Sequence, residues 1–177
     1  MIVRMSVGAA AALFFLMAGP PAQAQREDSG NACRSLIVGG YLSTVTDSDG
    51  NYVARQILTF HEDGALDVVD SDQMAGVSDA AFSAQKGRHH CTGRRSVSAY
   101  TLDFGFSGDG DFGLEAYEFT IEADGSLSGD LTLFLLTPLE TCNPFELSTC
   151  NVDLELGGFS VSAVRMPDWS ARREIAP

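Results

Sequence analysis

The chain has little positive charge. Its 177 residues include 11 Lys and Arg against 24 Asp and Glu, which gives a formal net charge of −13. Binding to nucleic acid needs clustered cations that neutralise phosphates, so we expect no nucleic-acid partner. An anionic membrane surface is disfavoured for the same reason. The acidic residues are spread along the chain rather than gathered in one tail, which is typical of a solvated exterior.

The sequence also lacks the short motifs of common catalytic and metal sites. It contains no Gly-x-Ser-x-Gly, no Gly-rich phosphate loop, no His-Glu-x-x-His and no Cys-x-x-Cys. His89 and His90 are adjacent, so on a strand they face opposite sides and do not hold one metal together. We therefore predict no metal site and no cofactor, and the sequence assigns no catalytic residue.

Long apolar runs are scarce, and the one of about a dozen residues, 7–18, lies near the N-terminus. It follows Arg4 and precedes the small-residue pattern Ala22-Gln23-Ala24. These features predict a secretory signal peptide over residues 1–24. The run is too short for a membrane span. We expect a secreted or periplasmic protein without a membrane anchor after cleavage.

Four cysteines remain after the predicted cleavage, and four permit three pairings. Cys142 and Cys150 bracket a short loop, so we pair them and leave Cys33 with Cys91. An oxidising compartment preserves such bonds. The alternative is four separate thiols, which export makes less favourable.

Turn signals divide the rest of the chain into short strand-forming runs. The clearest stretch is 52–73, where two runs rich in Val, Ile, Leu, Phe and Thr are joined by Glu62-Asp63-Gly64. Asp-Gly at such a turn predicts a β-hairpin, because glycine takes a positive φ at little cost. Similar turns recur along the chain. The run 33–46 is the predicted first strand, and 153–166 is the last, with a phase change at Gly157-Gly158 that a β-bulge would produce.

This count gives eight strands with short connections and no convincing amphipathic helix. We predict an all-β fold, an eight-stranded antiparallel up-and-down barrel, with a two-sheet β-sandwich as the alternative. The predicted organisation is a signal peptide (1–24), a flexible leader (25–32), the barrel domain (33–166) and a C-terminal tail (167–177).

Strict alternation of large apolar and polar residues indicates which side chains face the barrel interior. The predicted interior candidates for ligand binding are Tyr52, Gln56, Leu58, Phe60, Tyr100, Leu102, Phe104, Tyr117 and Phe119. An apolar interior with a few hydroxyl and amide groups is how small-molecule sites are built. The alternative is a filled core whose tyrosines reach the rim. The run 131–136 is apolar in both phases, so we expect both of its faces to be covered, by a second subunit, the tail or a loop.

Three stretches suggest a family resemblance: Gly40-Tyr41, LTFHEDGALDVVDSDQ at 58–73 and FSAQKGRHHCTG at 82–93. The chain resembles small bacterial barrels of the allene oxide cyclase-like group and, more loosely, the lipocalin-like calycins. That resemblance implies an eight-stranded barrel that binds small hydrophobic molecules, some of whose members catalyse cyclisations in the lumen. A lipocalin would show Gly-x-Trp where this chain has Gly39-Gly40-Tyr41.

Three functional hypotheses follow. The first is an exported barrel that binds a small apolar ligand. The second is a cofactor-independent cyclase or isomerase, which needs an ionisable group such as Glu115 or Arg55 facing the lumen. The third is an envelope structural or interaction protein, possible as a homo-oligomer, suggested by the run 131–136.

Overall fold

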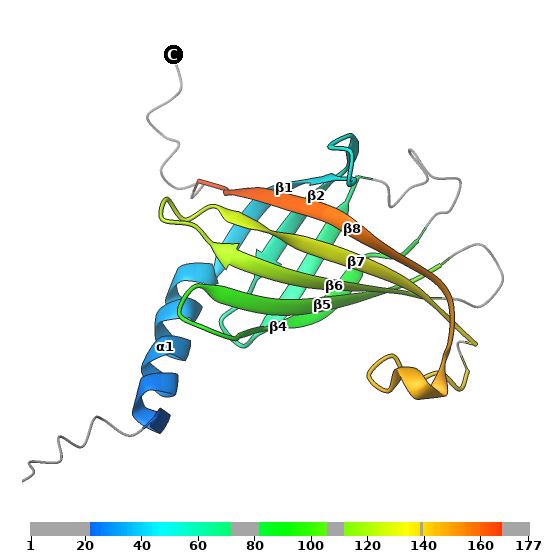
Figure 1. Ribbon diagram of the computed structural model, residues 1–177, viewed down its shortest axis with the longest axis horizontal. Helices are drawn as coiled ribbons and strands as arrows, with labels where there is room; N and C mark the ends of the chain where they lie inside the picture. The colour runs from blue at the N-terminus through cyan, green and yellow to red at the C-terminus, as the bar shows by residue number, and fades with distance from the viewer. Residues whose placement is uncertain (1–21, 72–81, 106–111, 139, 168–177) are drawn as a thin grey trace, which may run out of the picture.

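The chain folds into a closed eight-stranded barrel (Figure 1) in a computed structural model that describes residues 22–71, 82–105, 112–138 and 140–167. Each strand pairs antiparallel with its neighbours in sequence, and β8 pairs with β1 to close the sheet. The strands are β1 (Gly39–Thr46), β2 (Tyr52–Phe60), β3 (Ala65–Asp70), β4 (Gln85–Cys91), β5 (Ser96–Phe104), β6 (Phe112–Ile121), β7 (Leu127–Thr137) and β8 (Asn151–Arg165). The predicted up-and-down barrel is confirmed, and the sandwich alternative is wrong. Residues 1–21 of the predicted signal peptide (1–24) and the tail from residue 168 lie outside the described residues.

The hairpin predicted over residues 52–73 is formed by β2 and β3. Gly64 has a φ of 83° in its turn, and the chain reverses so that Phe60 pairs with Leu66 and Gln56 with Asp70. Leu58, Phe60, Leu66 and Val68 are buried in the barrel. The alternation of residue types therefore fixes which face of this hairpin turns inward.

A helix, α1 (Ala22–Ile37), precedes the barrel, where a loose leader and the start of a first strand were predicted. The first strand begins only at Gly39, so the prediction that Cys33 starts it is wrong. Cys33 and Ile37 lie one turn apart on the helix and are fully buried in the barrel core, and the helix lies at one end of the barrel (Figure 1). Burial of these two side chains and the bond from Cys33 to the barrel stabilise a segment whose sequence has little helical periodicity of its own.

The C-terminal end of α1 is fastened to the barrel by polar contacts. The Tyr41 hydroxyl donates a hydrogen bond to the Leu36 carbonyl at 3.2 Å, and the Arg165 guanidinium donates to the same carbonyl at 3.1 Å. Arg165 also lies over the Tyr41 ring, 5.7 Å from its centroid. These contacts satisfy a carbonyl at the end of the helix, where no intrahelical donor remains. We call this the helix end of the barrel.

The last strand contains the predicted β-bulge. Leu131 pairs with Phe159 and Leu133 with Leu156, so two residues of β8, Gly157 and Gly158, lie opposite one residue of β7. Gly158 in this insertion has a φ of 81°, which explains the glycine. Only residues 160–165 of β8 pair with β1. The longer first part of β8 extends past β1 with β7 on one side (Figure 1).

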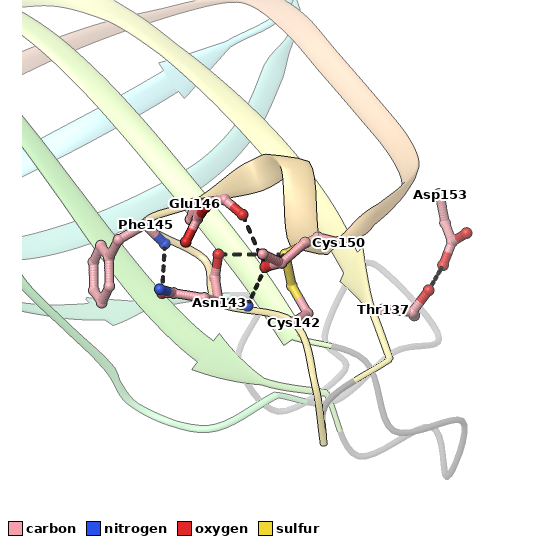
Figure 2. Close-up of a disulfide and its surroundings, with 8 residues drawn as sticks. Thr137, Cys142, Asn143, Phe145, Glu146, Cys150 and Asp153 are labelled. Atoms are coloured by element: carbon pink, nitrogen blue, oxygen red, sulfur yellow. Dashed lines mark hydrogen bonds between the residues drawn. A yellow bond between two sulfur atoms is a disulfide. The ribbon is translucent and has the colours of Figure 1, made fainter.

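A second, smaller apolar cluster lies on the outer face of β5, β6 and β7. Phe112, Leu114 and Leu136 are buried there, beside Cys142 and Cys150 of the loop between β7 and β8. The Cys142–Cys150 disulfide pins this loop, and the Asn143 side chain and backbone bond across it (Figure 2). The apolar run 131–136 therefore faces the lumen on one side and this loop on the other. A second subunit, the tail or a loop was expected to cover the run 131–136, and in the described residues the loop covers it.

Candidate lumen site

Buried polar side chains gather at the end of the lumen opposite α1. They come from the inner faces of β2 to β6. Asp70, Gln85 and Asp103 lie at the strand ends away from the helix, and Gln56 and Tyr117 lie near the middle of β2 and β6. Six of them, each less than a tenth exposed, form one connected group, the lumen cluster: Gln56, Asp70, Gln85, Asp103, Glu115 and Tyr117. Polar groups removed from water are retained only with hydrogen-bond partners, so this cluster is a specific feature of an otherwise apolar interior.

Gln56 is one centre of the cluster. Its side-chain nitrogen donates to an Asp70 carboxylate oxygen at 2.8 Å and to the Tyr117 hydroxyl at 3.2 Å. The same nitrogen lies 3.4 Å from Glu115 Oε2. Because β2 and β6 lie on opposite walls, these contacts span the lumen.

Glu115 is the other centre. It accepts a hydrogen bond from Gln85 Nε2 at 2.8 Å and one from the Tyr117 hydroxyl. Burial is the largest of the effects that together raise the pKa of Glu115 to about 7; the negative charges of Asp70 and Asp103 also raise this pKa, and the hydrogen bonds from Tyr117 and Gln85 lower it. Burial, together with the neighbouring Glu115 charge, raises the pKa of Tyr117 well above its ordinary value, so the phenol stays protonated as a donor. Near neutral pH, Glu115 is thus a carboxyl group that can hold or release a proton.

Asp103 occupies space that a glycine provides. It pairs with Gly113 across β5 and β6, and a Cβ at Gly113 would come within 2.8 Å of the Asp103 carboxylate. Gln85 Nε2 lies 3.5 Å from the same carboxylate. Gly113 therefore sets the position of Asp103 next to Glu115.

Two buried acceptors in this region lack a hydrogen-bond partner. Gln85 Oε1 has none, although the nitrogen of the same amide is bonded to Glu115. Thr101 Oγ1, on the inner face of β5 two residues before Asp103, has none either. Both side chains are 1% exposed, so open solvent does not satisfy them. Leaving a buried acceptor unpaired costs about 1–3 kcal/mol, which a bound donor would recover.

The wall next to Glu115, formed by β7 and β8, is apolar. Glu115 pairs with Leu133, and Leu133 pairs with Leu156; Gly113, Leu135 and Leu154 form the next row. Residues directly opposite each other on neighbouring strands share a face of the sheet. Leu154 and Leu156 are 40% and 39% exposed, unlike the fully buried leucines at the helix end. An acidic wall and a partly open leucine wall thus meet at this end of the lumen.

Five of the nine predicted interior residues are buried on the inner face: Gln56, Leu58, Phe60, Tyr117 and Phe119. Tyr52 was predicted inside but is 58% exposed, because it is the first residue of β2, next to the turn that follows β1. Of the two ionisable candidates, Glu115 lies in the lumen and Arg55 is exposed on the outer face. Whether any of these residues binds a ligand stays a prediction.

The predicted phase of β5 is wrong. Tyr100, Leu102 and Phe104 were expected inside, but Val97, Ala99, Thr101 and Asp103 are the buried alternate set. The large side chains instead face outward, where Tyr100 packs edge-on against Phe145, with ring centroids 5.2 Å apart. The disulfide-pinned loop covers this outer face (Figure 2). Small and acidic residues are left for the lumen, which makes room for the cluster.

Sequence reasoning missed half of the lumen cluster. Asp70, Gln85 and Asp103 were not among the candidates, since a polar residue in an alternating strand is ordinarily assigned to the wet face. The position along the strand could have identified them: Asp70 lies on the same face of β3 as the apolar residues Leu66 and Val68. Asp103 is likewise in step with Val97 and Ala99, which are small and apolar.

Both predicted disulfides are confirmed, Cys33–Cys91 and Cys142–Cys150. They are consistent with an extracytoplasmic protein. Within the described residues, no group of three His, Cys, Asp or Glu is arranged to hold a metal ion. In the same part of the chain no helix has both the length and the apolar character to cross a membrane.

Fold and site together define an eight-stranded antiparallel closed β-barrel with a polar, acidic cluster buried in its lumen. No protein-family model, no curated protein and no solved structure matches the chain significantly. The resemblance to allene oxide cyclase-like and calycin barrels therefore stays a prediction beyond the shared strand architecture.

Proposed function

We propose that this protein is an exported barrel that binds a small molecule with an apolar body in the half of the lumen that contains Glu115. The observation that carries the proposal is the lumen cluster itself. A few convergent polar groups in an apolar enclosure are the usual construction of a small-molecule site, with the polar groups fixing the orientation of the ligand. The unpaired acceptors of Gln85 and Thr101 support the same reading.

Secretion or location in the periplasm is part of this proposal. The predicted signal peptide and the two disulfides both favour an oxidising compartment. A lumen site suits such a protein, because a carrier outside the cytoplasm shields an apolar molecule from water.

Native mass spectrometry of the protein purified from its source tests the proposal. We expect a mass adduct that is released on unfolding. Leu133→Trp, which fills the lumen beside Glu115, should abolish the adduct. The matched control is Ile57→Trp, because Ile57 is 40% exposed on the outer face of β2. A wild-type protein without an adduct, which also takes up no apolar probe when incubated with one, would contradict the proposal.

A second candidate function, a cyclase or isomerase acting in the lumen, is favoured by one observation. Glu115 is a buried carboxyl with a pKa of about 7 beside a phenol donor, the arrangement that general acid–base chemistry needs near neutral pH. A bound molecule recovered unchanged after long incubation with wild-type protein would argue against catalysis. Conversion by wild type and retention without conversion by Glu115→Gln would support it.

The third hypothesis, an envelope structural or interaction protein, has lost its original reason. The run 131–136 suggested a missing partner, yet its outer face is packed against the loop of Cys142 and Cys150 in the same chain. A homo-oligomer stays a prediction that sedimentation would test.

A further inference from the structure

Three buried polar atoms on two neighbouring strands have no hydrogen-bond partner among the described residues: Gln85 Oε1, His89 Nδ1 and Thr101 Oγ1. Their residues are 1%, 8% and 1% exposed. Gln85 and His89 alternate with Gly87 along the inner face of β4, and Thr101 on β5 pairs directly with Gly87. The three residues therefore surround one position of the lumen wall that has no side chain.

All three atoms can accept a hydrogen bond. His89 Nε2 lies 3.0 Å from the His61 carbonyl oxygen, which only accepts, so we assign the proton to Nε2 and the acceptor to Nδ1. Burial lowers the pKa of His89, which keeps the ring neutral at neutral pH. Gln85 Oε1 belongs to an amide whose nitrogen is already bonded to Glu115. The Thr101 hydroxyl can donate as well as accept.

A hydroxyl group meets this pattern better than an N–H group. A hydroxyl can donate to Gln85 Oε1 and at the same time accept from the Thr101 hydroxyl, whereas an N–H only donates. A second hydroxyl would donate to His89 Nδ1. Thr101 lies diagonally across from both Gln85 and His89, and such neighbours are roughly 7–8 Å apart. Two hydroxyls at that separation fit on one small molecule.

The surroundings set the body of this molecule. Ala99, which pairs with His89, is small, and Gly87 has no side chain, so β4 and β5 take up little of the lumen here. The buried Phe60 ring lies 5.1 Å from the His89 ring and 6.0 Å from the Phe119 ring, centroid to centroid. These aromatic side chains offer an apolar surface to a compact ligand, the size that the interior of an eight-stranded barrel admits.

We propose that the ligand is a compact apolar diol. One hydroxyl lies between Gln85 and Thr101, and the other donates to His89. The apolar body lies against Phe60 and Phe119. This inference rests on the proposed function, since it names the ligand class of the same lumen. It adds two hydroxyl groups, each with stated partners, to the apolar molecule that the barrel alone suggests.

Calorimetric titration of the oxidised protein with two probes of nearly equal shape tests the inference. The probes are 1,4-benzenedimethanol, which has two hydroxyls, and 4-ethylbenzyl alcohol, in which a methyl group replaces one of them. We expect the diol to bind at least about tenfold more tightly, because the alcohol leaves a buried acceptor unpaired. If water satisfies the three atoms, the hydrophobic effect predicts the opposite order, since the alcohol is the more apolar probe.

Thr101→Val locates the first hydroxyl with a change that keeps the shape of the side chain. We expect the variant to reduce the preference for the diol severalfold. It should also raise the stability of the free protein, because it removes a buried hydroxyl that has no partner. Thr120→Val is the matched control, because Thr120 is exposed on the outer face of β6. A Thr101→Val protein that keeps the full preference for the diol would overturn the assignment.

His89 gives a direct readout of the second hydroxyl. In protein labelled with nitrogen-15 histidine, the Nδ1 resonance of His89 should shift upfield when the diol is added, because Nδ1 then accepts a hydrogen bond. The resonances of His61 and His90, which are both exposed, should stay in place. Tight binding of the diol without a shift at His89 would overturn the inference.

The outcomes separate the two proposals. If 4-ethylbenzyl alcohol binds in the lumen and the diol binds no more tightly, the diol is wrong and the small-molecule barrel stands. If neither probe binds, both proposals fail. The comparison of probes on the wild-type protein needs no variant to fold.

Discussion

The side-chain nitrogen of Gln85 lies 2.8 Å from a carboxylate oxygen of Glu115, which links β4 to β6 although β5 runs between them in the sheet. The link is possible because the β5 residue that pairs with Glu115 is Thr101, whose side chain is short. One consequence is that Glu115 is held by neutral donors rather than by a cation. Its ionisation near neutral pH therefore costs free energy and affects stability.

Glu115→Gln is expected to change the pH dependence of stability. The folded-state pKa, about 7, lies above the ordinary value of 4.5, so the folded protein binds more protons than the unfolded chain between these values. This group's contribution is therefore lost as pH rises from about 5 to 8. At about pH 8 the variant should be more stable than wild type by roughly 1–3 kcal/mol, and at about pH 4 the two should agree.

Urea unfolding at several pH values measures this difference, with Glu118→Gln as the control. The comparison between variants is needed because burial lowers the pKa of His89, which makes wild-type stability fall in the opposite direction, below about pH 6.5. Parallel curves for wild type and Glu115→Gln would show that Glu115 ionises without a cost.

The two disulfides should contribute unequally. Cys33–Cys91 closes a loop of 58 residues and Cys142–Cys150 one of 8. In the chain-entropy model, replacing both cysteines of the first pair by serine lowers the free energy of unfolding by about 4 kcal/mol, and of the second by roughly 2.5 kcal/mol. Chemical denaturation of the two double variants measures this order. A larger loss from the short loop would indicate that packing of the loop over Leu136, rather than chain entropy, dominates.

The outer apolar cluster should behave as a true core. Leu136 is fully buried although it lies on the outer face of β7, so Leu136→Ala should cost about 2–4 kcal/mol. Leu154→Ala deletes the same atoms from a side chain that is 40% exposed and should cost less than about 1.5 kcal/mol. Thermal or urea unfolding of the two variants measures the loss of unfolding free energy in each. Equal losses would mean that the loop does not protect Leu136 in solution.

Gly87 should not tolerate a side chain. A Cβ at this position on β4 would come within 1.7 Å of the Tyr100 carbonyl oxygen of β5, which is backbone and cannot turn aside. Gly87→Ala should therefore cost about 3 kcal/mol or prevent folding. Gly93→Ala is the control, because its nearest neighbour, the Ser96 hydroxyl, would be 3.4 Å away. Equal stability of the two variants would contradict this close approach of β4 and β5.

The inward-facing residues of a strand could be predicted only where the outer face of that strand is exposed to solvent. On β2, and on β6 beyond Leu114, the outer face is mostly wet, so alternation identified Leu58, Phe60, Tyr117 and Phe119 as inner residues. On β5 the outer face is partly covered as well, and the larger side chains, Tyr100 and Leu102, pack against the outer cluster. Residue size then points to the wrong face. The barrel itself was predictable because turn signals and strand count do not depend on phase.

The helix and the lumen acids were hidden for a different reason. α1 is held by two buried side chains, Cys33 and Ile37, and by bonds from Tyr41 and Arg165, all of which are tertiary contacts. The acidic side chains can face inward because the amide nitrogens of Gln56 and Gln85, on other strands, donate hydrogen bonds to them. Such partners lie many residues away along the chain, so the local sequence pattern around each residue does not predict these contacts.

The overhang of β8 gives a closed barrel one free margin. Within the described chain, residues 151–159 pair with β7 alone, so the backbone groups of their far side face no other strand. An exposed margin of this kind can recruit strands from other molecules. Asp153 and Glu155 lie along it and are exposed, and two like copies brought edge to edge would place these carboxylates against each other. The carboxylates of Asp153 and Glu155 thereby oppose edge-to-edge pairing of two copies along this part of the described chain.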